Sequence, residues 1–289
     1  MNSAVIAARP HHWTKNLLVF APIILGHRWS APPVWYAAGI AFLAFCCFAS
    51  ATYILNDLLD ANSDRDHPLK KNRPIASGAL GRGPAALATI LLLAVGSLAA
   101  LQTARGSRIA LVLYVVSSVL YSKWLKSVAL IDVLLLGGFY TIRVLAGGAA
   151  TGIAISPWTL AFSMFLFLSL AIAKRYIEVD RHGPSARRAY RTEDKTTLQL
   201  LGVGTGLMSI QVLALYINSP EVLALYSSPR YLWLMCPVIL YWIARVWLRA
   251  ARRELTDDPL IFALKDPASY LAGACALFIL VLASGPQAH

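Results

Sequence analysis

Charged side chains are scarce in this chain, and their scarcity excludes whole classes of protein. Asp, Glu, Lys and Arg together make up 14% of the 289 residues, whereas hydrophobic residues make up 58%. The mean hydropathy is +0.60. A soluble domain needs more polar surface than this composition supplies, so a secreted or cytosolic globular enzyme is excluded and a polytopic helical membrane protein is expected.

Cysteine is also rare. The four cysteines all lie within apolar runs and match no metal-ligand spacing, so we interpret them as packing residues. The N-terminal segment is polar and basic as far as Lys15, which does not fit the pattern of a cleavable signal peptide. Low-complexity segments and a second soluble region are lacking too. We therefore expect residues 1–289 to form one integral membrane domain.

Apolar runs, by contrast, are abundant. At about 20 residues per span, they predict an all-α polytopic membrane protein with nine transmembrane helices. The first run is short and contains Pro22, which indicates a broken or tilted helix and leaves a count of eight open. The predicted spans lie near 16–27, 33–55, 84–102, 108–122, 128–148, 157–177, 196–217, 230–248 and 268–285.

The net charge of +12 is divided unequally between the two sets of loops. Of the 26 Lys and Arg residues, 21 flank one side of the predicted bundle, four flank the other, and Arg143 lies inside a span. The positive-inside rule therefore predicts a multi-pass protein of the cell (inner) membrane with its N-terminus and basic loops in the cytoplasm. Because the basic residues sit beside spans, anionic lipid and phosphate ligands explain the charge better than nucleic acid does.

An acidic cluster follows the second predicted span. Asp57, Asp60 and Asp64 fall within an arc of about 60° on a continued helix, and Asn56 flanks the same face. Three converging carboxylates repel one another unless a cation neutralises them, and a cation that keeps few protein ligands and shares phosphate oxygens is typically Mg²⁺. The pattern therefore predicts a Mg²⁺ site for a diphosphate at the membrane surface.

Basic residues follow these aspartates within a few positions. Lys70 offers a point charge and Arg73 a bidentate fork, which together suit the non-bridging oxygens of a diphosphate. We expect both side chains to stabilise the charge that accumulates on a leaving diphosphate. The alternative is a solvated loop whose charges only fix the topology.

A second charged cluster follows the sixth predicted span. Lys174, Glu178 and Arg181 share a helical face at i, i+4 and i+7. Because the second and sixth spans end on the same side, we expect this cluster to face the first across a central cavity open to the cytoplasm. Glu178 or Asp180 would then serve a metal. An ion pair at a helix end is the alternative.

Other polar residues lie inside the spans or at their ends. Arg143 is expected to line the bundle interior, because an intramembrane charge is costly unless it faces a polar cavity or a partner. Asp132, near the start of the same span, is expected to contact a nearby lysine or the site, or to form a helix-end ion pair. Further expected substrate contacts are Lys15, Asn16, Tyr53, Asn56, Lys123 and Lys126.

Together these motifs resemble the UbiA-type intramembrane prenyltransferase superfamily. Residues 56–64 match its Asn-Asp-x-x-Asp-x-x-x-Asp motif, which follows the second of nine helices. In the aromatic prenyltransferases of the superfamily a second motif resembles Asp-x-x-Tyr-x-x-x-Asp. Aligning Tyr176 and Asp180 with that motif leaves Ala173 where its first aspartate should be. This chain therefore departs from the pattern expected for a prenyl diphosphate donor.

The departure resembles one branch of the superfamily, the polyprenyl-phosphate (decaprenyl-phosphate) phosphoribosyltransferases. The likeness implies Mg²⁺-dependent transfer of 5-phosphoribose from 5-phosphoribosyl 1-diphosphate to a polyprenyl phosphate, giving a cell-envelope pentose donor precursor and diphosphate. It also implies that Lys174 and Arg175 supply cations for the extra phosphate of the donor. The segments that carry it are Arg9-Pro-x-x-Trp-x-Lys-Asn16, Asp64-Arg-x-His-Pro-x-Lys-x-x-Arg-Pro-Ile-Ala-Ser-Gly78, 138–143, Lys174-Arg-Tyr-x-Glu178 and 258–266.

Two other functions stay open. A prenyl-diphosphate transferase acting on an aromatic or quinone precursor fits the superfamily motif, although Ala173 speaks against it. A carrier or channel for an anionic solute would explain Arg143 and a basic cavity, but it does not require three aspartates at metal spacing. Helix packing of this kind is also compatible with a homo-oligomer.

Overall fold

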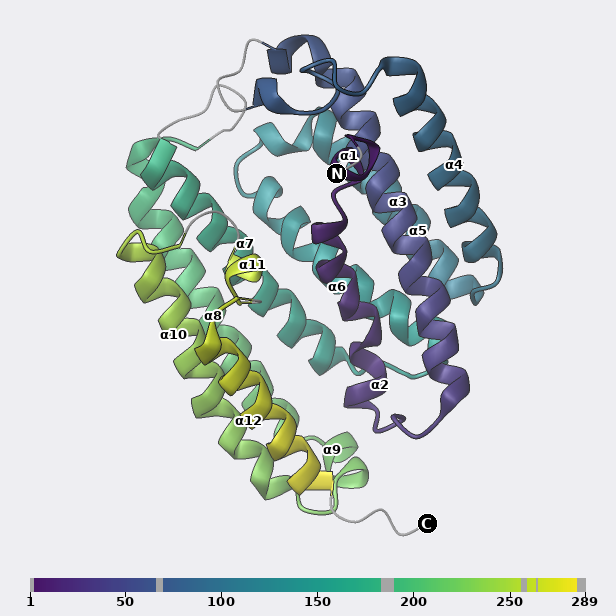
Figure 1. Ribbon diagram of the computed structural model, residues 1–289. Helices are drawn as coiled ribbons and strands as arrows, with labels where there is room; N and C mark the ends of the chain where they lie inside the picture. The colour runs from purple at the N-terminus through teal and green to yellow at the C-terminus, as the bar shows by residue number, and fades with distance from the viewer. Residues whose placement is uncertain (1–2, 66–69, 183–189, 256–258, 264, 285–289) are drawn as a thin grey trace. The chain divides into compact units, whose positions relative to one another are not determined.

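The computed structural model describes residues 3–65, 70–182, 190–255, 259–263 and 265–284, and these residues form helices and no strands (Figure 1). Residues 66–69, 258 and 264 of the predicted motifs lie outside the described part. The α-helices are α1 Ser3–Ala8, α2 Ala21–Leu25, α3 Pro32–Arg65, α4 Arg82–Leu101, α5 Arg105–Lys123, α6 Ile131–Thr151, α7 Pro157–His182, α8 Lys195–Ile217, α9 Pro220–Leu225, α10 Met235–Ala251, α11 Pro259–Ala263 and α12 Pro267–Ser284. The 3₁₀-helices are η1 Pro10–Phe20, η2 Lys70–Asn72, η3 Leu125–Ser127, η4 Thr192–Asp194 and η5 Pro229–Leu234.

Proline marks the start of several of these helices. The first residues of α3, α7, α9 and α12 are Pro32, Pro157, Pro220 and Pro267. Proline suits this position because the first N–H groups of a helix have no partner within the helix and the fixed φ of proline is already helical.

Seven helical segments within the described residues are long and apolar enough to cross a membrane, so the chain is a multi-pass membrane protein. They contain α3, α4, α6, α7, α8, α10 and α12 and correspond to seven of the nine predicted spans. The other two predicted spans are also helical, but their helices are not both long and apolar enough to be counted among these seven segments. Residues 16–27 hold the end of η1 and the short α2, which fits the predicted interruption at Pro22, and residues 108–122 lie within α5.

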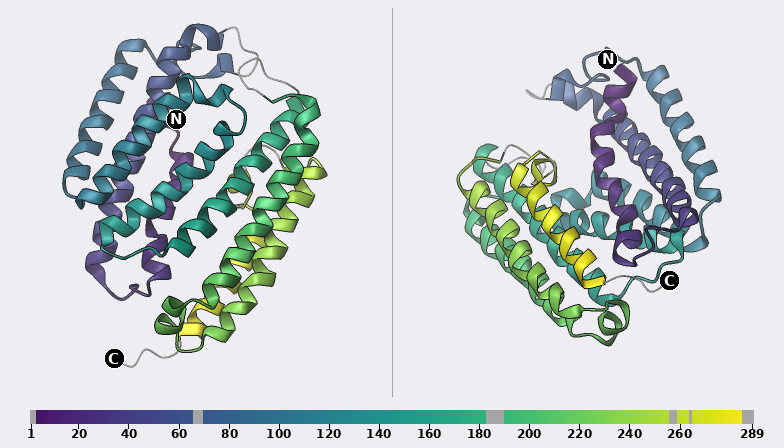
Figure 2. Two further views of the ribbon diagram at one scale, coloured as in Figure 1. Left: turned by 180° about the vertical axis from the view of Figure 1, so that it is seen from behind. Right: turned by 60° about the horizontal axis from the view of Figure 1, so that its bottom comes forward.

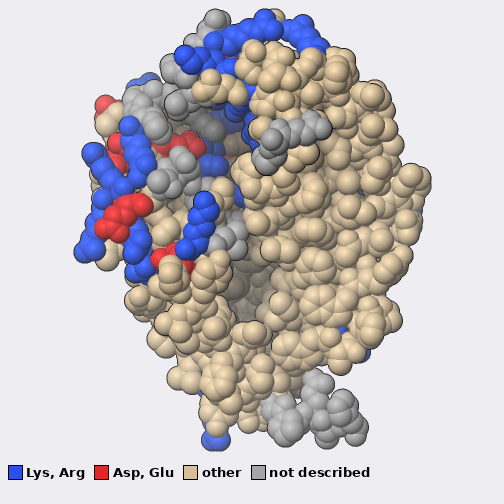
Figure 3. All heavy atoms as spheres, viewed as in Figure 1, with Lys and Arg blue, Asp and Glu red and all other residues tan. Residues whose placement is uncertain are grey.

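The contacts divide the chain into two units. Unit 1 comprises Met1–Trp124 and Ile142–Ile155, and unit 2 comprises Leu125–Thr141 and Ser156–His289. In unit 1, α3 packs against α4, α5 and η1, and in unit 2, α7 packs along α8 while α10 packs against α8 and α12 (Figures 1 and 2). The charged side chains of unit 2 gather at the end where α7 and α10 finish, and most of its visible remaining face is uncharged (Figure 3).

Small residues let the helices approach closely within each unit. A Cβ atom on Gly147 of α6 would lie 2.1 Å from the carbonyl oxygen of Val19, so only glycine fits against η1 there. A Cβ atom on Gly202 of α8 would lie 2.1 Å from the ring of Trp247 in α10. Close packing through small residues is typical of membrane helices.

Candidate functional site

The aspartate motif lies on the last turns of α3. This helix has 34 residues, a length of about 51 Å, which exceeds the roughly 30 Å of the hydrocarbon core of a bilayer. Its C-terminal turns can therefore lie beyond the apolar region while remaining helical. The prediction that Asp57, Asp60 and Asp64 continue the helix is confirmed, since α3 ends at Arg65.

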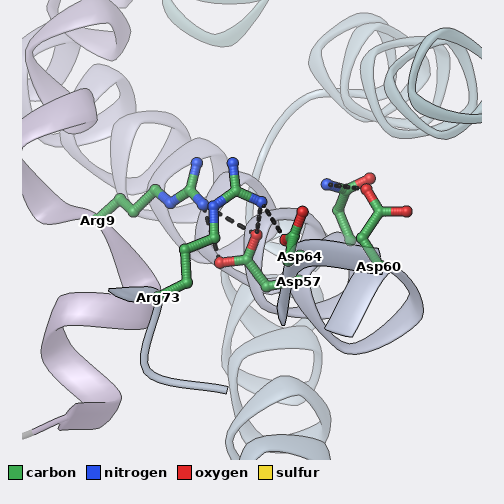
Figure 4. Close-up of polar contacts among 6 residues, drawn as sticks. Arg9, Asp57, Asp60, Asp64 and Arg73 are labelled. Atoms are coloured by element: carbon green, nitrogen blue, oxygen red, sulfur yellow. Dashed lines mark hydrogen bonds and ion pairs between the residues drawn. The ribbon is translucent and has the colours of Figure 1, made fainter. Parts of the chain in front are cut away.

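Arg9 binds the first aspartate of this motif. Its Nη2 donates to both carboxylate oxygens of Asp57, at 2.9 Å to Oδ1 and 2.8 Å to Oδ2 (Figure 4). Arg9 precedes η1 with a φ of 51°, a left-handed conformation that is uncommon outside glycine. Its guanidinium carbon lies 5.3 Å from the centre of the Tyr53 ring. The N-terminal segment thus supplies a cation to the motif on α3.

Arg73 joins two aspartates of the motif. Its Nη1 donates to Asp57 Oδ1 at 2.9 Å and to Asp64 Oδ2 at 2.7 Å (Figure 4). The segment that follows Arg73 is anchored on α3, because Ile75 packs in an apolar cluster with Ile54. The side chains of Asp57 and Asp64 are 3% and 1% exposed, so water screens these ion pairs little.

One acceptor in this cluster lacks a partner among the described residues. Asp64 Oδ1 is buried and accepts no hydrogen bond from them, which costs about 1–3 kcal/mol. Asp57 and Asp64, held together by one nitrogen of Arg73, offer the hard oxygen donors that Mg²⁺ takes in ones or twos beside water and phosphate oxygens. The residues present therefore fit a Mg²⁺ ion that arrives with a phosphate ligand.

Asp60 lies apart from the other two aspartates (Figure 4). Its Oδ2 faces Asn56 Nδ2 at 3.4 Å. Across the described ranges, no three His, Cys, Asp or Glu side chains are grouped closely enough to hold a metal ion. The predicted set of three aspartates is thus assembled only in part: Asp57 and Asp64 share Arg73, and Asp60 does not join them.

Arg143 is buried within unit 1, at 4% exposure. Its Nε donates to Asn16 Oδ1 at 2.7 Å and its Nη2 to the hydroxyl of Tyr114 at 3.3 Å. The guanidinium also lies over the rings of Tyr114 and Phe45, at 4.8 and 5.9 Å from their centres. As predicted, Arg143 faces the protein interior, where it ties α6 to η1 and α5.

The remaining predicted residues of the first cluster and the nearby spans occupy different environments. Lys15, Tyr53, Lys70, Lys126 and Asn56 are half-buried. Lys123 is exposed, with its Nζ 5.7 Å from the centre of the Trp124 ring. The four lysines of this set are therefore at least partly accessible to a ligand.

In unit 2, Arg175 is held by two carboxylates. Its Nε and Nη2 bind both oxygens of Asp132, and its Nη1 binds Glu178. Asp132 is fully buried, Arg175 is 1% exposed, and the Glu178 side chain is 34% exposed. The helix-end ion pair considered for Asp132 is therefore present, and its partner is Arg175. This differs from the predicted substrate contact of Arg175, because its side chain is 2% exposed and has no open face for a phosphate, whereas the side chain of Arg73 is 25% exposed.

Asp180 takes part in a second ion-pair cluster of unit 2. Lys195 of α8 donates to its Oδ1 at 2.5 Å, and Arg253, after α10, donates to both of its oxygens at 2.8 and 3.2 Å. The carboxylate of Asp180 is 4% exposed and joins the ends of three helices. Asp180 was the alternative to Glu178 as a metal ligand, and exposure favours Glu178, whose side chain is 34% exposed against 4% for Asp180.

Sequence reasoning missed three of these contacts. Arg9 belongs to a quoted motif, but nothing in the spacing placed it on Asp57, 48 residues away. Tyr114 lies in an apolar run with no motif around it, and only the fold brings its hydroxyl to Arg143. Lys195 lies at the start of a span, where its charge was attributed to topology alone.

The comparisons with known proteins agree on one family. A family model described as "UbiA prenyltransferase family" matches residues 17–266. The chain is 36% identical over 281 residues to the uncharacterized protein y4nM of Sinorhizobium fredii, covering 95% of this chain and 54% of that protein. It is 34% identical over 276 residues to the nodulation protein NoeC of Azorhizobium caulinodans, covering 91% of this chain and 87% of that protein.

A further relative is the decaprenyl-phosphate phosphoribosyltransferase of Mycobacterium tuberculosis, 32% identical over 204 residues that cover 68% of each protein. The chain spans about half the length of the Sinorhizobium fredii relative. Among solved structures, a UbiA homologue from Archaeoglobus fulgidus bound to GPP and Mg²⁺ matches with a TM-score of 0.71 at 15% identity, covering 96% of both chains. At that identity the match shows a shared fold.

Proposed function

Because the chain belongs to the UbiA prenyltransferase family, we propose that it performs a transfer reaction of this family in which the donor is a sugar. The donor is 5-phosphoribosyl 1-diphosphate, the acceptor is a polyprenyl phosphate, and the products are polyprenyl-phosphoryl 5-phosphoribose and diphosphate. The relatives named decaprenyl-phosphate phosphoribosyltransferase support this choice, with 32–34% identity over about two thirds of the chain.

The composition of the second cluster carries the proposal. Position 173 is a fully buried alanine, and Asp180 is occupied by two cations from other elements. Among the described acids of α7, this leaves Glu178 as the partly exposed carboxylate. Lys174 adds a half-buried cation beside it. A cluster poor in available acid and provided with cations suits a donor with an additional phosphate better than a second metal ion.

The first cluster would hold the donor diphosphate. Asp57 and Asp64 are the proposed Mg²⁺ ligands, with Asp60 and Glu178 as further ones. The ion would replace the guanidinium groups of Arg9 and Arg73 on these carboxylates, which leaves Arg73 available to the diphosphate. The ion, when bound, neutralises charge on the diphosphate and makes it a better leaving group. Arg73 and Lys70 would then contact diphosphate oxygens and stabilise the charge that develops as the bond to the sugar breaks.

The acceptor needs no strong base in this reaction. An oxygen of the lipid monophosphate, already an anion, forms the bond to the anomeric carbon while the bond from that carbon to the diphosphate breaks. The leaving diphosphate keeps the electron pair. Catalysis then depends on holding two anions close together, which basic side chains make possible by neutralising both.

Cations outside the first cluster would position the acceptor phosphate. The proposed contacts are Lys15, Lys123 and Lys126, which the structure leaves half-buried or exposed. Arg143, with its guanidinium on Asn16 and Tyr114, is assigned as a positioning residue that keeps η1 in place. Arg175 is likewise a positioning residue, because it orients Glu178.

A donor panel tests the proposal. Purified protein in detergent is given Mg²⁺ and either labelled 5-phosphoribosyl 1-diphosphate with polyprenyl phosphate, or labelled prenyl diphosphate with an aromatic acid. We expect label in the lipid fraction from the first pair, with loss of product in EDTA. Asp57→Asn should remove the activity, while Glu254→Gln, an exposed acid of the loop after α10, should retain it.

Two results would reject this assignment. Prenylation of the aromatic acid without sugar transfer would establish the alternative enzyme. Metal-independent uptake of either donor into sealed vesicles, without a new product, would favour the carrier or channel.

A further inference from the structure

Unit 2 contains a basic hollow that none of the proposed catalytic residues lines. Its volume is about 500 Å³. It lies where charged atoms gather in Figure 3, at the end of α10 and around α11. The lining residues are Arg245, Arg249, Phe262, Lys265, Asp266, Pro267 and Ala268.

One ion pair in this hollow is internally satisfied. Arg245 donates to both oxygens of Asp266, at 2.8 and 3.3 Å. Asp266 also accepts hydrogen bonds from the backbone N–H and the hydroxyl of Ser269, at 3.0 and 3.1 Å, and so caps the start of α12. Among the described residues that line the hollow, the one acid is therefore matched by one of three cations, and the other two determine the net charge of this lining.

Those two cations face the hollow from different elements. Arg249 of α10 lies over the Phe262 ring at 5.4 Å from its centre, which restricts the guanidinium. Its contact with Glu254 is 3.6 Å long and joins two partly exposed side chains, so it offsets little of the charge. Lys265, just before α12, is exposed. An anion in the hollow would meet both positive groups.

An apolar groove of about 530 Å³ lies along α10 and α12. Its lining residues Ala263 and Ser269 directly follow Phe262 and Ala268, which line the hollow. Trp242 and Ser269 line the groove, and Trp242 Nε1 donates to Ser269 Oγ at 2.9 Å, beside the Asp266 cap. The space at Gly273 is open, because a Cβ atom there would meet nothing within 4 Å. Figure 1 shows α12 running alongside α10, the two helices that form the walls.

A cationic hollow at the end of an apolar groove matches an amphiphile with an anionic head. We propose that the hollow and groove bind one anionic phospholipid of the bilayer, with its phosphate against Arg249 and Lys265 and an acyl chain between α10 and α12. Lipid from the bilayer reaches this groove without entering the protein, since the groove-lining Tyr270 and Leu277 are 61% and 48% exposed. This site is separate from the transfer reaction and does not depend on it.

Native mass spectrometry from nanodiscs tests the phosphate contacts. With equal amounts of phosphatidylglycerol and phosphatidylcholine, the wild-type protein is expected to retain phosphatidylglycerol preferentially. Each cation removed should weaken the binding of phosphatidylglycerol about fivefold. The double variant that carries both Arg249→Gln and Lys265→Gln should therefore bind it about 25-fold more weakly. Arg252→Gln, which removes an exposed cation three residues further along the chain, is the matched control and should leave retention unchanged.

The groove has its own variant and control. Gly273→Leu fills it and should lower retention of both lipids, whereas Gly204→Leu adds the same bulk in α8, where a Cβ atom also meets nothing within 4 Å. Lys265→Gln alone, at an exposed position, tests the site if the double variant is poorly folded.

Three results would overturn the proposal. The wild-type protein could retain both phospholipids equally, or Arg252→Gln could lower retention as much as the double variant. Polyprenyl phosphate displacing phosphatidylglycerol, with the double variant raising only the KM for the acceptor, would assign the site to the acceptor lipid. Sugar transfer by the wild-type protein is measured in parallel, so failure of the lipid site and failure of the proposed reaction are separate outcomes.

Discussion

Replacing Arg175 with methionine separates a positioning role from a substrate contact. Asp132 and Arg175 are 0% and 1% exposed, and two guanidinium nitrogens hold both carboxylate oxygens. Removing the arginine leaves a buried carboxylate without its counter-charge, which typically costs about 3–5 kcal/mol. Arg175→Met is therefore expected to lower the free energy of unfolding by that amount.

A second substitution should restore most of this loss. Adding Asp132→Leu replaces the buried pair with apolar side chains, and such replacements are often neutral or stabilising. The double variant is expected to lie within about 1 kcal/mol of the wild-type protein. Unfolding by SDS in mixed micelles, followed by tryptophan fluorescence, measures both variants, and Arg181→Met, at a partly exposed guanidinium on a backbone carbonyl, is the control.

The kinetics of the double variant complete this test. As a positioning residue, Arg175 should affect kcat through Glu178 and change the KM for 5-phosphoribosyl 1-diphosphate less than threefold. The reasoning fails if Arg175→Met unfolds like the wild-type protein and the double variant shows a KM for this donor that is raised tenfold or more. Arg175 would then be a phosphate contact, as its sequence position first indicated.

Further substitutions separate the roles of the acids. Asp57→Asn and Asp60→Asn should each lower kcat more than a hundredfold, measured as labelled lipid formed at saturating Mg²⁺, and wild-type turnover would remove that aspartate from the site. Asp180→Asn should leave the Mg²⁺ concentration for half-maximal rate unchanged, because the 4% exposed Asp180 joins the ends of α7, α8 and α10; a tenfold increase would identify Asp180 as a metal ligand. The hydrogen bond from Arg245 lowers the pKa of Asp266, so the stabilisation this carboxylate provides is present above about pH 4 and is lost as pH falls through the lowered folded-state pKa. The Tm between pH 6 and 2.5 should therefore fall less steeply for Asp266→Asn, and an equal slope would contradict this.

Most of the helical architecture was predictable from the sequence because apolar length determines it. Seven predicted spans match long apolar helices, since about 20 apolar residues are needed to cross the hydrocarbon core and few other structures satisfy their backbone there. The segment near residues 16–27 was harder. It consists of 3₁₀ turns and the short α2, and Val19 of η1 packs against Gly147 of α6, a contact that hydropathy does not encode.

The site was predictable in its residue types and less so in its partners. Helical periodicity correctly placed Asp57 and Asp64 on the C-terminal turns of α3, because that geometry is local. The contacts of Arg9 and Arg73 depend on chain folding over 48 and 16 residues, and the pairing of Arg175 with Asp132 spans 43. Spacing along the sequence does not predict contacts over such separations. Arg73 and Arg175, which the sequence suggested as phosphate contacts, are therefore found on carboxylates.

The central claim is that the sugar carries the diphosphate and the lipid phosphate is the nucleophile. A donor labelled with ¹⁴C in the ribose and ³²P in the diphosphate tests it directly. With polyprenyl phosphate and Mg²⁺, the account predicts ¹⁴C in the lipid fraction and ³²P in the aqueous fraction as inorganic diphosphate, in equal amounts. Both labels remaining in the aqueous donor, while an unlabelled prenyl diphosphate releases diphosphate under the same conditions, would contradict it.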